Sequence, residues 1–252
     1  MKKSFKRLLA VIFAITMVLG MVPFMSEPVD AASYKFLNTV FVIPSMDHET
    51  ANLTSQVNSF VVEDFGAVER RTSSYTVSTK DRFISRWNSM PNNQYVVVID
   101  SHGAPTSSIC GLTISDIDNL QWKQISYIVI LGCNSGHYDW RTENVARTFA
   151  EKFHTTVIAC DGNVGYGARP TSANPYIDYS FEPHCSAAWE KYCSQKRPSR
   201  RNMYGWLAYV PKSSANNYQG GLYQIGQRAR SMTVYEMLIN YSRGNITALP
   251  VK

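Results

Sequence analysis

Short stretches of apolar and β-branched residues recur along the chain and predict β-strands. Most are continuous apolar runs, which are typical of strands buried on both faces of a sheet, whereas residues 68–77 alternate instead. The stretches are residues 39–45, 68–77, 95–99, 127–131 and 156–159.

The segments between these stretches have apolar residues at helical spacing. Residues 49–60 and 79–87 predict helices, and residues 115–120 predict one helical turn. Residues 109–112 are consistent with a short strand of a hairpin. A further helix has one apolar face, formed by Val145, Ala146, Phe149, Ala150 and Phe153.

This alternation predicts an α/β fold with a mostly parallel central sheet and helices on both faces. We expect its core at about residues 38–165. The C-terminal part, residues 166–252, is richer in Gly, Pro, Asn, Ser and Tyr. It predicts a strand at 205–210 and a helix at 232–241, which a capping box from Thr233 to Glu236 would begin.

The first 31 residues have the three-part layout of a secretory signal. Four basic residues precede an apolar run from Leu8 to about Met25, and small residues follow at a cleavage point after Ala31. An uncleaved anchor is the alternative, because the run approaches the length that spans a membrane. Gly20 and Pro23 interrupt it, so we expect cleavage and a secreted domain of residues 32–252. The lysine-rich start and long apolar core are typical of bacteria, in particular Gram-positive ones.

Charge and cysteine content limit the classes of ligand and partner that we expect for the chain. The chain has 25 Lys and Arg against 19 Asp and Glu, and residues 1–31 hold four of the former and two of the latter, which leaves +4 on the mature chain. This mild charge is not a signature of nucleic-acid binding. The five cysteines form no C-x-x-C pair, so we expect no zinc site, and their odd number leaves a free thiol or an intermolecular pair.

Two residues that can perform covalent catalysis follow two of the predicted strands. His102 comes just after the strand 95–99, and Cys133 just after the strand 127–131. The carboxyl ends of parallel strands meet at one edge of a sheet, so neighbouring strands would bring thiol and imidazole together. A histidine can generate the thiolate, which is the reactive form of cysteine.

Other interpretations of these residues are weaker. Cys133 alone would be read as a small core residue. A serine-hydrolase elbow needs glycine two residues before and after the nucleophile, where this chain has Leu131 and Ser135. Asp100 and Ser101 are expected to form loop hydrogen bonds, and His137 is expected to be a surface or loop histidine.

The blocks YVVVIDSHG (95–103) and SYIVILGCNSG (126–136) resemble the His-Gly and Cys blocks of the caspase-like cysteine peptidases of clan CD. The intervening residues 109–117 are similar to the hairpin and short helix of caspases and bacterial CHAT domains. The helix at 144–150 and the VIACDG strand are also CHAT-like. The resemblance covers about residues 38–165 and extends to clostripain-type peptidases.

The resemblance implies hydrolysis of peptide bonds through a thioester, with a peptide or protein as substrate and neither metal nor organic cofactor. His102 would be the catalytic histidine and Cys133 the nucleophile. The backbone N–H groups of Gly103 and Cys133 would stabilise the oxyanion. The alternative is a catalytically silent caspase-like fold that serves as a secreted binding module or effector.

Two acidic residues are candidates for a substrate pocket. Asp161 and Asp47 each follow a predicted strand at the same edge of the sheet. A carboxylate in a partly dry pocket would favour Lys or Arg before the scissile bond, as clostripain-type relatives do. The competing interpretation is that Asp161 only shapes its Asp-Gly turn.

Overall fold

A computed structural model describes residues 36–66, 69–166, 179–182, 204–211, 220–228 and 230–250. They belong to one compact unit of the chain, Lys35–Lys252. The expected signal segment, Cys185 and Cys193 lie outside the described residues. None of the described helices combines the length and apolarity needed to cross a membrane.

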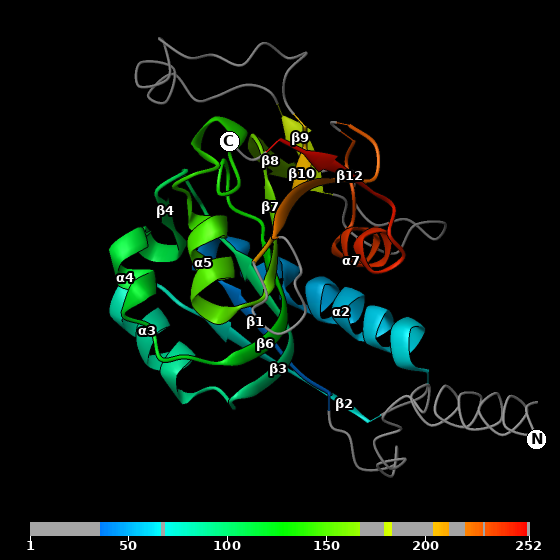
Figure 1. Cartoon of the computed structure of the whole chain (residues 1–252). Coiled ribbons are helices and arrows are strands. Elements are labelled where there is room, and N and C mark those ends of the chain that lie inside the picture. Colours follow the sequence, from blue (N-terminus) through cyan, green and yellow to red (C-terminus); the bar gives the residue numbers. More distant parts are fainter. Residues whose placement is uncertain are drawn as a thin grey trace, which may run out of the picture. The chain divides into compact units, whose positions relative to one another are not determined.

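An eight-stranded mixed sheet forms the centre of this unit, in the order β12-β11-β10-β7-β6-β3-β1-β2 (Figure 1). Within this order the strands β7, β6, β3, β1 and β2 run parallel to one another. They are β1 (Phe36–Val42), β2 (Arg70–Thr76), β3 (Asn93–Asp100), β6 (Gln124–Ile130) and β7 (Thr156–Cys160).

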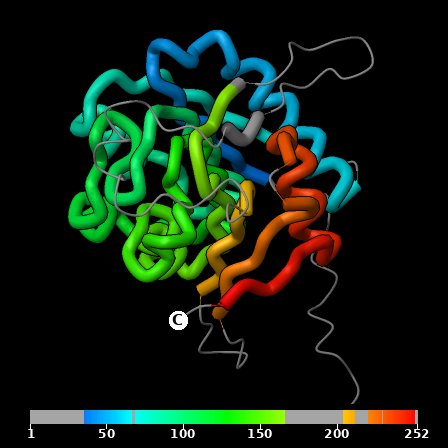
Figure 2. Tube along the Cα trace, turned by 90° about the horizontal axis from the view of Figure 1, so that it is seen from above, coloured from blue at the N-terminus to red at the C-terminus, as the bar shows by residue number. Residues whose placement is uncertain are grey.

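The C-terminal strands extend the sheet in the antiparallel sense. They are β10 (Trp206–Val210), β11 (Gly221–Ile225) and β12 (Ile246–Leu249), which lie side by side in yellow to red in Figure 2. Two small ribbons lie outside the sheet: β4 (Ser107–Ser108) with β5 (Leu112–Thr113), and β8 (Asn163–Tyr166) with β9 (Tyr179–Glu182).

Helices cover both faces of the sheet (Figure 1). One face packs against α2 (Thr50–Phe65) and α7 (Val234–Ser242), and the other against α3 (Lys80–Ser89), α4 (Ile114–Asp118) and α5 (Val145–Phe153). Short 3-10 turns follow three strands or loops: η2 (Pro44–Glu49), η3 (Ile109–Gly111) and η4 (Tyr138–Trp140).

Successive side chains of β3 point to opposite faces of the sheet, and both faces are buried, which explains why its run is continuously apolar. Val96 and Val98 pack in the cluster with α2 and α7, while Val97 and Ile99 pack in the cluster with α3 and α5. All four are fully buried. A strand covered on both faces has no polar side, so its sequence does not alternate.

The predicted α/β fold with a mostly parallel sheet and flanking helices is confirmed at this level, and its caspase-like character stays a prediction. Each strand and helix predicted within the described residues has a counterpart with ends shifted by a few residues, except the hairpin strand expected at 109–112. Residues 109–111 are instead the 3-10 turn η3 between β4 and β5, and only Leu112 of that range belongs to a strand. The predicted apolar face of α5 is buried throughout, and both hydrogen bonds of the capping box at Thr233 and Glu236 are present. The prediction missed β11, β12 and the β8–β9 ribbon.

Candidate active site

His102 and Cys133 follow neighbouring parallel strands. The last paired residues of β3 and β6 are Ile99 and Ile130, and each candidate lies three residues beyond its strand's partner. The N–H of Leu131 donates to the Ile99 carbonyl at 2.8 Å, which continues the ladder toward the site. The predicted adjacency of these two strands is therefore confirmed. Neighbouring strands lie about 5 Å apart, so the two segments leave the sheet side by side.

Three small residues pack where the two segments meet. A Cβ on Gly103 would lie 2.7 Å from the Ser135 Oγ and 3.0 Å from the Cys133 carbonyl oxygen. A Cβ on Gly132 would lie 2.7 Å from the same Oγ and 3.3 Å from the Gly103 Cα. Ser135 is fully buried, and its hydroxyl has no partner among the described residues. The backbones after His102 and before Cys133 are therefore in direct contact, with Ser135 wedged beside them.

The Cys133 thiol is half-buried and lies against the backbone of β8. Its Sγ accepts the Val164 N–H at 3.3 Å and lies 3.7 Å from the Val164 carbonyl oxygen. The N–H favours the thiolate, whereas the carbonyl, to which the thiol donates, favours the protonated thiol, so activation of Cys133 requires a base. Burial raises the pKa of the Cys110 thiol, and it raises the pKa of the fully buried Cys160 well above its usual value. Those two thiols are therefore poor nucleophiles at neutral pH.

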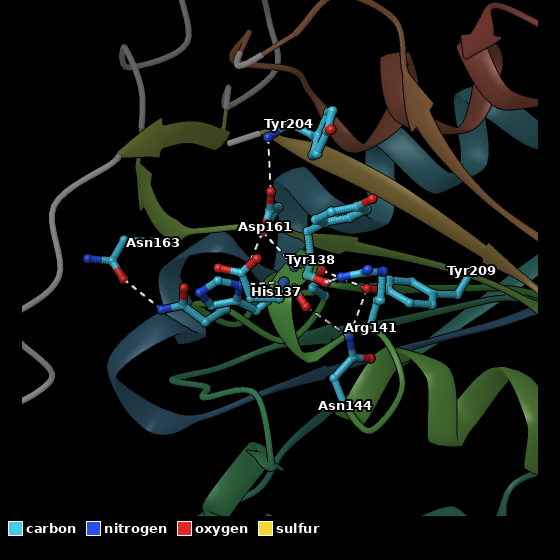
Figure 3. Close-up of polar contacts among 11 residues, drawn as sticks. His137, Tyr138, Arg141, Asn144, Asp161, Asn163, Tyr204 and Tyr209 are labelled. Carbon is cyan, nitrogen blue, oxygen red and sulfur yellow. Dashed lines mark hydrogen bonds and ion pairs between the residues drawn. The ribbon is translucent and has the colours of Figure 1, made fainter. Parts of the chain in front are cut away.

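Residues 133–138, which we call the nucleophile turn, are held firmly by the segment after β7. The Asn134 N–H donates to the Gly162 carbonyl at 2.6 Å, and the Gly136 N–H donates to the Cys160 carbonyl at 3.0 Å. The Asn134 side chain donates to Asn163 Oδ1 at 3.0 Å (Figure 3). Asn134 has φ of 56°, a left-handed conformation that asparagine tolerates better than most residues.

The other side of the turn is held by Tyr209 of β10 and by Asn144, the N-cap of α5. The Tyr209 hydroxyl donates to the Gly136 carbonyl at 2.8 Å, and it accepts a 2.7 Å bond from Asn144 Nδ2. Asn144 Oδ1 accepts the Arg147 N–H, which caps the helix. Because these side chains are buried, the turn has little freedom to move.

Asp161 anchors the same turn rather than facing a pocket. One carboxylate oxygen accepts the Tyr138 N–H at 2.7 Å, and the other accepts the Tyr204 N–H at 2.9 Å (Figure 3). The residue is 1% exposed. Burial raises the pKa of Asp161 to about 7, although both N–H bonds favour the ionised form. This arrangement fits the turn-shaping interpretation of Asp161.

His137 lies in the turn, but it is buried, so the expectation of a surface residue is wrong and that of a loop residue is confirmed. Its Nδ1 accepts the Asp139 N–H at 3.2 Å and lies 3.4 Å from Asp161 Oδ1. That short approach would be an ion pair only if the imidazole were charged. Burial lowers the pKa of His137, and Nδ1 already accepts a hydrogen bond, so we assign a neutral imidazole.

A cavity of about 560 Å³ opens beside His102 at the carboxyl ends of β1, β2 and β3. The chain passes from β1 to β2 on one side and then to β3 on the other, so the strand order reverses here. Such switch points are where ligands bind in open α/β sheets. We call this space the switch cavity. His102 and Gly103 line it, whereas Cys133 is not among the described residues that do so.

Neither predicted pocket aspartate lines the switch cavity. Asp47 is exposed on η2, where its carboxylate accepts a hydrogen bond from the Thr76 hydroxyl. Asp161 is buried against the nucleophile turn, with both oxygens engaged. The structure therefore brings His102, Gly103 and Cys133 together, and it leaves Asp47 and Asp161 outside this group.

The structure also reveals a buried acid that the sequence reasoning assigned to a loop. Asp100 is the last residue of β3, fully buried, and neither of its oxygens has a partner among the described residues. Burial, and next the charge of the nearby buried Glu49, raise the pKa of Asp100 well above its usual value. The expectation of a loop hydrogen bond is therefore wrong for Asp100, whereas it is confirmed for Ser101, whose hydroxyl donates to the His102 carbonyl at 2.9 Å. The position of Asp100 two residues before His102 was the only sequence signal available.

The described residues contain no group of three or more His, Cys, Asp or Glu that could hold a metal ion. Comparisons of the chain with protein-family models, curated proteins and solved structures gave no match. The assignment of a function therefore rests on the geometry and chemistry of the site.

Proposed function

We propose that this protein is a cysteine endopeptidase in which Cys133 is the nucleophile and His102 the general base and acid. The observation that carries the proposal is the register of β3 and β6. Ile99 pairs with Ile130, and each candidate catalytic residue lies three positions after one of them. The backbone contact between Gly103 and Gly132 supports it, because it keeps the two segments together beyond the last ladder bond. The caspase-like resemblance of the two sequence blocks points in the same direction.

The chemistry begins with a proton transfer from the Cys133 thiol to His102. The thiolate attacks the carbonyl carbon of the scissile peptide bond and forms a tetrahedral intermediate. The imidazolium then donates its proton to the leaving nitrogen, and the carbon–nitrogen bond breaks to give a thioester on Cys133. Water attacks the thioester, His102 takes its proton, and the carboxylic product and free thiol are released.

The backbone supplies the oxyanion donors in this proposal. The Gly103 N–H donates to no backbone carbonyl among the described residues, so it can donate to a substrate oxygen. The Cys133 N–H would be the second donor. The close packing of Gly103 against Ser135 and Gly132 fixes the direction of its N–H before substrate binds. Donors that are held in place in this way stabilise a developing oxyanion without reorganisation.

A peptide library read by mass spectrometry tests the proposal directly. The purified chain should cleave a subset of peptides, and Cys133→Ala and His102→Ala should each lower cleavage by at least about 10³-fold while circular dichroism stays unchanged. Cys110→Ala is the matched control, because it removes a neighbouring thiol of raised pKa and should keep cleavage intact. Cleavage that survives in Cys133→Ala would refute the assignment.

A thiol-directed acylating peptide probe separates the enzyme from a silent binding module. In the enzyme the probe should label Cys133 alone in reducing buffer, and His102→Ala should slow labelling strongly, because the thiolate would lose its base. Equal labelling of Cys110 and Cys133 would favour the binding module instead.

We also propose that residues 1–31 direct export and are removed. The basic start, the apolar run and the small residues before Ala32 support this. Amino-terminal sequencing of the exported protein should then begin at Ala32, and a retained apolar run would point to an anchor.

A further inference from the structure

We propose that the switch cavity is the subsite for the residue that follows the scissile bond, and that it selects an uncharged, mainly apolar side chain there. The inference rests on the proposed function and adds a substrate class to it. It differs from the expectation of a basic side chain before the scissile bond, for which Asp161 and Asp47 were the candidates.

The location of the cavity follows from which catalytic residue borders it. His102 and Gly103 line the cavity, and among the described residues Cys133 does not. The Cys133 thiol instead lies at the Val164 backbone of β8. The two candidate catalytic residues therefore border different spaces.

The chemistry of the reaction assigns those spaces to the two halves of the substrate. The acyl half becomes bonded to the Cys133 sulfur, so it must lie on the thiol's side. The leaving half receives its proton from His102 at the nitrogen of the broken bond, so that nitrogen must lie within hydrogen-bonding reach of the imidazole. A side chain attached next to that nitrogen therefore extends toward the space beside His102, which is the switch cavity.

The walls of the cavity determine which side chain fits. Ile43, Pro44, Val77 and Ala104 supply its apolar surface, and the remaining walls are mostly serine and glycine. None of the described lining residues is Asp, Glu, Lys or Arg. In the acyl-enzyme, where His102 acts as a base and is uncharged, a charged side chain would lose water here without gaining an opposite charge, and that loss is costly.

One polar group in the wall can act on a ligand. Ser108 is 3% exposed, and its hydroxyl has no hydrogen-bond partner among the described residues. It is the last residue of β4, in the β4–β5 hairpin that contributes to the wall of the cavity. A serine or threonine side chain on the substrate could pair with it, so we expect hydroxyl side chains to be accepted together with apolar ones.

The cavity's volume does not discriminate by size alone. At about 560 Å³ it falls within the usual range of ligand sites and exceeds the volume of any single side chain. Its selectivity must therefore come from the chemistry of the walls, and a leucine should be accepted as readily as a serine.

Aminolysis of the acyl-enzyme tests this subsite without knowledge of the preferred acyl residue. A cleaved peptide, taken from the library experiment, forms the thioester in the presence of an amino-acid amide. The neutral amine attacks the thioester carbonyl, His102 takes a proton from it, and the carbon–sulfur bond breaks to give a new peptide. By microscopic reversibility the amide binds where the leaving half was bound. The ratio of aminolysis to hydrolysis is measured for the amides of Leu, Ser, Lys and Glu.

The expected result is that Leu and Ser amides are captured at least about 10-fold more efficiently than Lys and Glu amides, because a charged side chain would lose water in the cavity without gaining a partner. Ser78→Trp places a large ring at the exposed rim of the cavity and should lower the ratio for Leu amide by about 10-fold. Ser74→Trp is the matched control, because Ser74 is an exposed residue of β2 outside the cavity, and it should leave all ratios unchanged.

The failures are distinguishable. If no thioester forms and no peptide is cleaved, the proposed function falls and the subsite falls with it. If peptides are cleaved but the four amides are captured equally, or Ser78→Trp behaves as Ser74→Trp does, the enzyme stands and the subsite is refuted. Preference for the Lys or Glu amide would likewise refute the uncharged subsite.

Discussion

The contact between Gly132, Gly103 and Ser135 yields a prediction whose magnitude follows from distances. In Gly132→Ala the new Cβ would lie 2.7 Å from the Ser135 Oγ, closer than real Cβ contacts, and 3.3 Å and 3.4 Å from the Gly103 Cα and the Ser101 carbonyl oxygen. Overpacking of this kind costs about 1–3 kcal/mol of the free energy of unfolding. Because only the Oγ contact is prohibitive, removal of that atom should rescue the variant.

The double variant Gly132→Ala/Ser135→Ala isolates this contact. Among the described residues the Ser135 hydroxyl has no hydrogen-bond partner, so Ser135→Ala alone should cost little. With the Oγ gone, the alanine at 132 meets only tight but tolerable neighbours, and the loss of a glycine's freedom in the unfolded chain stabilises by about 0.4–1 kcal/mol. We therefore expect a favourable coupling energy of about 1–3 kcal/mol between the two positions.

Gly103→Ala provides the matched contrast. Its Cβ would meet the same Oγ at 2.7 Å, but also two backbone atoms, the Cys133 carbonyl oxygen and the Gly132 carbonyl carbon, each at 3.0 Å. Ser135→Ala cannot remove these backbone contacts, so rescue should be partial at best. Urea denaturation of the three single and two double variants measures both couplings, and labelling of Cys133 by the thiol probe reports whether the site is restored. Equal rescue of both alanines, or a cost below about 0.5 kcal/mol for Gly132→Ala, would show that the two segments do not pack in this way.

The remaining predictions concern charge and nucleophilicity. Cys160→Ala should keep peptide cleavage, measured with the best library peptide, because burial raises the pKa of that thiol; loss of cleavage without loss of folding would contradict this. Asp100→Asn should raise the free energy of unfolding by about 1–3 kcal/mol near pH 8 and by less near pH 5, since a buried acid of raised pKa loses stability as it ionises with rising pH. A variant that is less stable than the wild type at both pH values in urea melts would show that Asp100 has a favourable partner. Tyr209→Phe should lower stability by about 1–3 kcal/mol in the same assay, because the hydroxyl bonds to Gly136 and Asn144 would be lost from a buried site; an unchanged midpoint would contradict the anchoring of the turn.

Much of the fold could be predicted from local patterns, because burial on two faces leaves a direct mark on the sequence. The runs 95–99 and 127–131 are continuous because β3 and β6 contact helices on both sides. The C-terminal strands were harder. Within β11, Leu222 and Ile225 are buried whereas Tyr223 is half-exposed, and β12 is largely exposed at the sheet edge, so neither carries a clear period.

The site was predictable only in part, for a geometric reason. His102 and Cys133 could be identified because they follow predicted strands, and the carboxyl ends of parallel strands lie at one edge of the sheet. The role of Ser135 depends on a turn that folds its hydroxyl back between two glycines 29 positions apart in the sequence, at 103 and 132. No local pattern marks a contact of this kind. The switch cavity is likewise formed by residues after three separate strands.

Asp161 shows how burial changes the interpretation of an acidic residue. An Asp-Gly pair after a strand is compatible with a pocket that attracts cations and with a turn, and the difference lies in what the oxygens contact. Here each oxygen accepts a backbone N–H, from Tyr138 and from Tyr204, and the side chain is shielded from solvent. A substrate cation would have to displace one of these bonds to reach it. The carboxylate is thus committed to joining the nucleophile turn to the start of β10.

The stabilisation that Asp161 gives to the nucleophile turn therefore depends on pH in a defined direction. The pKa of Asp161 is about 7 in the folded protein, above its value near 4 in an unfolded chain, so the folded state holds the proton more tightly. Its contribution to stability is therefore fully present below about pH 4 and is lost as pH rises to about 7, by at most about 4 kcal/mol. The neutral His137 has a lowered pKa and acts in the opposite sense, because its unfolded form takes up a proton as pH falls. Because His137 Nδ1 lies 3.4 Å from Asp161 Oδ1, the comparison of Asp161 with Asp161→Asn is made with His137→Gln in both chains, and their stability difference should shrink from pH 4.5 to pH 7.5. A difference that is constant across this range would show that Asp161 ionises in the folded protein as it does in an unfolded chain.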